Sequence, residues 1–301
     1  MMASTAKGRA MKFVTGVAMT DPSFYVPLAR AAEEAGFDVM TIPDSICYPE
    51  ESDSKYPYTP DGAREFLENK PFLEPMVAIA AMAAVTSRIE FCPFVLKLPI
   101  RHPVIFAKEA TSLAVLSGDR LSLGVGTSPW PDDYEIVGLP WAGRGRRFEE
   151  CIAIIRGVAA GGYFELHGEF YDVPPIKMNP TPSRPIPILI GGHSQANIRR
   201  AAILADGWMP AGMAPDELLR TIGTLGELRK EYGREHEPFA IYAFGPPDVD
   251  QLHRLEELGI THAMTGYFGT FNPYGADTDT EPLADKIDRL HRFGEEVIAK
   301  Y

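Results

Sequence analysis

The sequence predicts a single (β/α)8 barrel, and two observations lead to this fold class. Short runs rich in β-branched residues alternate with longer segments of helical period, and eight such units fill the 301 residues without a linker between them. Strict alternation indicates a parallel sheet with crossover helices, and eight units of this length fit a closed barrel. An open doubly wound sheet fits less well because the GxGxxG turn expected after its first strand is absent. We therefore expect one domain over residues 11–301, preceded by a flexible leader at 1–10.

The elements follow in order from their patterns. The expected strands are apolar runs that end in small or polar residues, at 13–19, 38–42, 88–96, 120–126, 186–190, 207–209, 239–244 and 262–266. The expected helices carry apolar residues at helical spacing, and they lie before Gly36, at 75–85, from 103 to Gly118, at 147–158, from 194, at 215–232, at 249–258 and from 282. Proline at 103 supports a helix start because proline is favoured at the first helical position.

Two kinds of segment interrupt this rhythm. Residues 161–185 contain two short strand-like runs around a His-Gly-Glu turn, which predicts a β-hairpin inserted after the fourth strand. Long loops follow strands two, four and eight, and those at 46–72 and 267–281 are candidates for substrate walls or lids.

Composition restricts the function class. The formal net charge of −12 argues against a general nucleic-acid or anionic-membrane binder, because both need a cationic footprint. Three cysteines without CxxC spacing and seven histidines without HxH or HExxH spacing give no sign of a metal site. No GxSxG elbow, phosphate-binding P-loop, signal peptide or membrane-length apolar run is visible. We expect a cytoplasmic protein with a small-molecule substrate.

The candidate site lies at the carboxyl ends of the strands, where βα loops begin. The fifth strand ends in Gly191-Gly192-His193-Ser194. Glycines let a ligand approach the backbone, and a serine at a helix N-cap marks free N–H groups that favour an anion. This run is therefore either a phosphate site or a plain turn with a serine cap.

Two further strand ends carry polar groups. Asp44 follows the second strand, where a carboxylate can accept a hydrogen bond or act as a base, or can simply cap a turn. Thr127 follows the run Gly124-Val125-Gly126 and offers a hydroxyl at the barrel mouth. His102 is more typical of a packing or capping residue than of a ligand, and Arg144 lies at a helix start from which it could reach an anion.

Six short motifs share an order and spacing that are specific in combination. They are AGFD at 35–38, LPIRHP at 98–103, LGVG at 123–126, YEIVG with RGRRFEE at 134–138 and 144–150, PILIGG at 187–192 and ADGW at 205–208. Through them the chain resembles the luciferase-like monooxygenase family over nearly its whole length. The resemblance implies a (β/α)8 barrel with a hairpin insertion, FMN or coenzyme F420 bound in the barrel mouth, and a homodimer. It also implies a non-proline cis peptide between about Phe94 and Val95.

The resemblance assigns roles to individual residues. The cofactor phosphate would lie on Gly191, Gly192, His193 and Ser194, and the ring would contact Asp44, Phe94, Val95 and Thr127. Asp44 is also the expected catalytic residue, and Ser45 and Trp130 are expected to contact substrate. The phosphate turn and the run from 130 to 141 resemble actinobacterial members that use coenzyme F420, so we expect F420, with FMN as the alternative.

Two positions depart from the best-known sugar-phosphate dehydrogenase of the deazaflavin branch. There a catalytic histidine follows the aspartate and a glutamate follows the GVGT run, whereas this chain has Ser45 and Pro129. We therefore expect hydride transfer to or from an apolar or conjugated substrate. The alternatives are an FMN-dependent monooxygenase, a lyase with Lys97 as the Schiff-base lysine, and a barrel that binds the cofactor without catalysis.

Overall fold

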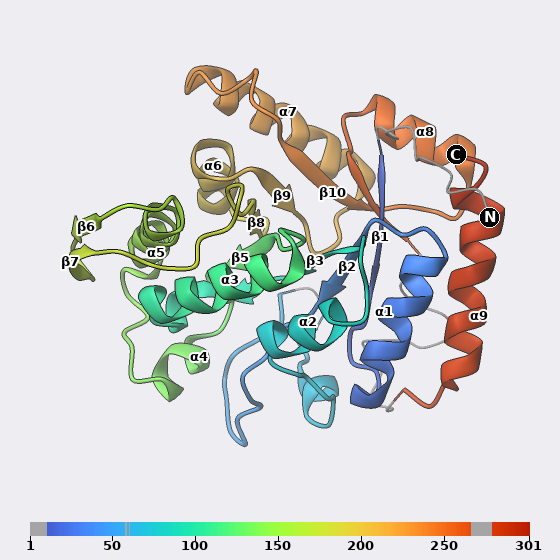
Figure 1. Cartoon of the computed structure of the whole chain (residues 1–301), viewed down its shortest axis with the longest axis horizontal. Helices are drawn as coiled ribbons and strands as arrows, with labels where there is room; N and C mark the ends of the chain where they lie inside the picture. The colour runs from blue at the N-terminus through green and yellow to red at the C-terminus, as the bar shows by residue number, and fades with distance from the viewer. Residues whose placement is uncertain (1–10, 58, 60, 266–278) are drawn as a thin grey trace.

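The computed structural model describes residues 11–57, 59, 61–265 and 279–301. Nine parallel strands form one sheet in the order β3-β2-β1-β11-β10-β9-β8-β5-β4. A parallel bridge between Phe91 and Leu121 brings β3 beside the chain that enters β5, so the sheet nearly closes into a barrel, and helices surround it (Figure 1). The predicted barrel is confirmed. The expected leader at 1–10, Gly266 and most of the loop at 267–281 lie outside the described residues.

The barrel strands are short and lie at the predicted places. They are β1 (Lys12–Gly16), β2 (Val39–Ile42), β3 (Glu90–Pro93), β4 (Leu96–Lys97), β5 (Leu123–Gly126), β8 (Ile188–Gly191), β9 (Gly207–Met209), β10 (Ala240–Phe244) and β11 (His262–Met264). β3 and β4 are two halves of the third predicted strand, separated by Phe94 and Val95, so nine strands occupy eight barrel positions. The peptide bond between Phe94 and Val95 is cis, as the resemblance implied.

The helices cover the outside of the barrel. They are α1 (Tyr25–Glu34), α2 (Pro75–Ala83), α3 (Pro103–Ser117), α4 (Pro131–Ile136), α5 (Arg144–Ala159), α6 (Gln195–Leu204), α7 (Pro215–Glu231), α8 (Val249–Glu257) and α9 (Leu283–Phe293). The sequence reading missed α4, whose single short turn gives little periodic signal. The helix expected at 147–158 begins earlier, at Arg144, within the RGRRFEE run that we interpreted as a helix start. Among the described helices, none has the length and apolarity needed to cross a bilayer.

Two apolar layers hold the barrel together. The smaller one fills the barrel interior, where Cys92, Leu189 and Met209 are buried. The larger layer lies between strands and helices. The interior is tight at Gly124, where a Cβ atom would lie 2.0 Å from the Pro93 carbonyl oxygen, so only glycine fits. A packed interior leaves the strand ends as the place for a ligand.

The predicted hairpin is also present. β6 (Phe164–His167) and β7 (Asp172–Ile176) pair antiparallel between α5 and β8. Glu150 on α5 accepts hydrogen bonds from the backbone N–H groups of Glu169 at 2.7 Å and Phe170 at 3.0 Å. The hairpin is thereby fixed to α5.

Candidate active site

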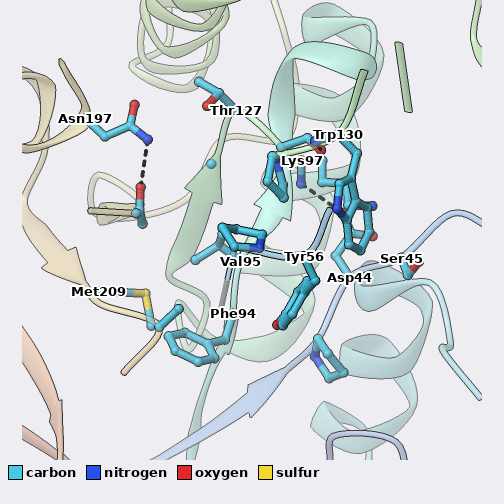
Figure 2. A pocket seen from close by; sticks show the side chains of 18 of the residues that line it. Asp44, Ser45, Tyr56, Phe94, Val95, Lys97, Thr127, Trp130, Asn197 and Met209 are labelled. Carbon is cyan, nitrogen blue, oxygen red and sulfur yellow. Dashed lines mark hydrogen bonds between the residues drawn. The ribbon is translucent and has the colours of Figure 1, made fainter. Parts of the chain in front are cut away.

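A cavity of about 540 Å³ opens at the carboxyl ends of the strands. All ten residues that the sequence predicted for the site line it, namely Asp44, Ser45, Phe94, Val95, Thr127, Trp130, Gly191, Gly192, His193 and Ser194. They come from four different strand ends, those of β2, β3, β5 and β8, which only the closed barrel brings together. Figure 2 shows Val95 between Asn197 on one side of the cavity and Trp130 on the other.

One end of the cavity is the N-terminus of α6. The Ser194 hydroxyl accepts a hydrogen bond from the Asn197 N–H at 3.2 Å, and the Asn197 side chain donates to the Gly191 carbonyl at 3.3 Å (Figure 2). The other N–H groups of the first turn have no acceptor within the helix. Together with the helix dipole they form a site suited to a phosphate.

Arg144 adds a positive charge to this cavity. It begins α5, and its guanidinium lies 3.6 Å from the centroid of the Trp141 ring. Both side chains line the cavity. Among the described residues, the recorded contact of the Arg144 side chain is the one with the Trp141 ring. The aromatic ring therefore orients this cation without neutralising it.

The floor of the cavity is the side chain of Val95. A Cβ atom on Gly126 would lie 2.9 Å from a Val95 methyl group, and one on Gly191 would lie 2.8 Å from the other. These two glycines are thus required by the bulge, and the sequence argument that Gly191 is small for the sake of a ligand was incomplete. Gly192 has a φ of +103°, a conformation that side-chain-bearing residues rarely adopt.

Asp44 lines the cavity, but both of its carboxylate oxygens are occupied. One accepts from Arg101 at 2.9 Å, and the other accepts from Arg101 at 3.0 Å and from the Lys97 N–H at 2.8 Å. The Asp44 side chain is 1% exposed. A bidentate guanidinium holds the carboxylate in a fixed orientation. The geometry therefore supports a role in positioning β4, and the catalytic role expected from the sequence stays a prediction.

His193 does not add a charge to the phosphate end. Its Nε2 accepts a hydrogen bond from the Ala211 N–H at 3.0 Å, which requires the neutral ring. Burial lowers the pKa of His193, while Glu217 opposes this shift. His193 thus helps to hold the loop after β9 against the phosphate turn.

The opposite end of the cavity is aromatic. Trp130 donates from its Nε1 to the Lys55 carbonyl at 3.2 Å, and its ring centroid lies 5.9 Å from that of Tyr56. Phe72 and Leu67 complete this wall. The loop between β2 and α2 therefore packs over the cavity. Trp130 lies against that loop, and its expected contact with substrate stays a prediction.

The sequence reading missed an ion pair at this end. Lys97, on β4, lines the cavity, and its Nζ lies 2.9 Å from Asp133 on α4. The two residues are only 5% and 3% exposed. Because α4 was not predicted, the position of Asp133 beside Lys97 could not be inferred from the sequence. Ser45 and Pro129 also line the cavity, and neither supplies an acid or a base there.

Comparison with known proteins shows the family of this chain. The family model described as luciferase-like monooxygenase matches residues 7–280. The chain belongs to the luciferase-like monooxygenase family. An uncharacterized protein of Mycobacterium tuberculosis is 56% identical over 292 residues, which cover 96% of this chain and 100% of that protein.

Two further proteins that are similar to this chain have named activities. The F420-dependent glucose-6-phosphate dehydrogenase of Nakamurella multipartita is 32% identical over 199 residues, which cover 64% of this chain and 54% of that enzyme. The crystal structure of the monooxygenase RslO1 from Streptomyces bottropensis superposes with a TM-score of 0.74 at 16% identity, over 97% of this chain and 100% of that one. This luciferase-like family member thus shares its barrel with a monooxygenase and part of its sequence with an F420-dependent dehydrogenase.

Proposed function

We propose that this chain is an oxidoreductase that binds coenzyme F420 in the barrel mouth and acts on an apolar or conjugated small molecule. The observation that carries the proposal is that the two ends of one cavity differ in chemical character. One end offers free N–H groups of α6 and the cation of Arg144, and the other end is lined by Tyr56, Phe72 and Trp130. A long ligand with a phosphate at one end and a planar ring at the other fits a cavity with one cationic end and one aromatic end.

The residues present suit a deazaflavin or flavin. Gly192 and Ser194 would hold the phosphate with Arg144, and Val95 would support the flat ring from below. When bound, the coenzyme supplies hydride-transfer chemistry. The chain itself binds the ring, orients the substrate and excludes water through the loop between β2 and α2.

The choice of F420 is supported by the relative from Nakamurella multipartita, whose name states F420 dependence. That relative is a glucose-6-phosphate dehydrogenase, yet Ser45 and Pro129 here lack the acid–base groups of a sugar dehydrogenase. The aromatic wall also suits an apolar substrate better than a sugar phosphate. We therefore extend the cofactor of that relative to this chain and not its substrate.

The test is titration of the purified protein with coenzyme F420 and, separately, with FMN, followed by calorimetry. Tight binding of F420 with weak binding of FMN is the expected result. The reverse result would move the proposal to FMN-dependent monooxygenation, which the fold shared with RslO1 supports. Binding of neither compound would contradict the proposal, and F420 binding without turnover on a broad panel of carbonyl compounds would favour a carrier.

A further inference from the structure

Lys97 places an ammonium group in the wall of the cavity at its aromatic end. Its Nζ lies 2.9 Å from the Asp133 carboxylate and 4.7 Å from the centroid of the Trp130 ring. An ammonium group has three N–H donors, and the two oxygens of Asp133 can take at most two of them. Because Lys97 also lines the cavity, at least one donor remains for a bound ligand.

The position of this ammonium group is fixed from several sides. The backbone N–H of Lys97 donates to Asp44 at 2.8 Å, and the carbonyl of Lys97 accepts from Arg101 at 3.0 Å. Asp133 also accepts a hydrogen bond from the Ser128 hydroxyl. Lys97 is therefore preorganised before any ligand binds, as effective electrostatic stabilisation requires.

The neighbouring cation Arg64 is paired with an aspartate and does not line the cavity. Arg64 lies 4.8 Å from the centroid of the Trp130 ring and is paired with Asp132 at 3.3 Å. Asp44 is paired with Arg101. Among the described residues, Lys97 is therefore the cation that lines the cavity beside Trp130.

We propose that Lys97 binds the carbonyl oxygen of the substrate and donates the proton of the reaction, and that the substrate is a planar conjugated carbonyl compound such as an enone. This inference rests on the proposed function, because the reduced coenzyme must supply the hydride. Tyr56, Phe72 and Trp130 offer the apolar surface that a conjugated ring system needs. A buried cation beside that surface offers what its carbonyl oxygen needs.

When a hydride adds to the β-carbon of an enone, the electron pair of the C=C bond moves to the carbonyl oxygen and an enolate forms. Lys97 stabilises that oxygen and then transfers one proton to the α-carbon of the enolate, which gives the saturated ketone and leaves Lys97 as the neutral amine. Water then returns a proton to the neutral amine, which restores the ammonium group beside Asp133 before the next turnover. The carbonyl compound is reduced by two electrons, and the coenzyme is oxidised by two.

The test uses p-nitrophenol, whose oxyanion resembles an enolate and absorbs visible light only when ionised. We expect the wild-type protein to increase the ionised fraction at fixed pH, which corresponds to at least a tenfold preference for the phenolate. The double variant Lys97→Met/Asp133→Asn removes both charges together, so no buried charge is left unpaired. It should lose this preference while it binds neutral nitrobenzene as tightly as the wild type.

Two single variants complete the design. Asp133→Asn keeps the ammonium group and should retain the preference for the phenolate. Lys97→Arg keeps a positive charge at this position and should retain most of that preference. An unchanged ionised fraction in the double variant, or no ionisation by the wild type, would overturn the role of Lys97. This readout needs no coenzyme, so it is independent of the F420 and FMN titrations, whose joint failure would overturn the proposed function instead.

Discussion

The pairing of Asp44 with Arg101 gives a prediction that separates positioning from catalysis. The substitution Asp44→Asn keeps the shape of the side chain but removes the charge from a carboxylate that is 1% exposed. Removing one partner of a buried ion pair costs about 3–5 kcal/mol. Glu74 remains 3.7 Å from Arg101 and is itself half-exposed, so we expect the lower end, roughly 3 kcal/mol.

The assay is urea unfolding of the wild type, Asp44→Asn, Arg101→Met and the double variant Asp44→Leu/Arg101→Met. The two single variants should each lose several times the stability that the double variant loses, because the double variant leaves no unpaired charge. Ser45→Ala, on the neighbouring residue, is the control and should change stability by less than about 1 kcal/mol. A stable Asp44→Asn variant that nevertheless lacks activity would refute the positioning role and restore Asp44 as a catalytic residue.

Three further predictions follow from packing, titration and surface composition. Gly191→Ala should lower stability by about 1–3 kcal/mol, because the added methyl group overlaps the Val95 side chain. Adding Val95→Ala should recover most of that loss in thermal unfolding, and no recovery would contradict the contact between Gly191 and Val95. Burial lowers the pKa of His262 from 6.5 to about 3. The unfolded chain then binds this proton more readily, so stability should fall by about 1.4 kcal/mol per pH unit from pH 6.5 towards 3, and His262→Phe should flatten that slope in unfolding curves. We also propose that the exposed Val77 on α2 and Ile105 on α3 belong to a homodimer surface, so that Val77→Asp/Ile105→Asp should be monomeric by light scattering, while an unchanged mass would exclude this surface.

The parts of the site that the sequence predicted are those encoded by local pattern. Strand ends and helix starts follow from periodicity, so the residues that line the barrel mouth could be predicted from the sequence without any distance between them. The family resemblance added the bulge, and the cis bond between Phe94 and Val95 is where it was expected.

The parts that the sequence did not predict depend on long-range pairing. Asp44 and Arg101 are 57 residues apart, and Lys97 and Asp133 are 36 residues apart. Nothing in the local pattern distinguishes a paired carboxylate from a catalytic one. The ion pair of Lys97 also requires α4, whose six residues are too few to show helical period.

The measurement that tests the central claim most directly is the affinity for coenzyme F420 of the wild type and of Ser194→Asp. Aspartate is as good an N-cap as serine, so α6 should remain folded while a negative charge enters the phosphate site. Gln251→Glu places the same charge on the first turn of α8 and is the matched control, because Gln251 does not line the cavity. We predict at least a tenfold loss of affinity for Ser194→Asp, about 1.4 kcal/mol or more, and no change for Gln251→Glu. Equal affinity in all three proteins would contradict the placement of the phosphate, and with it the cofactor site proposed for this barrel.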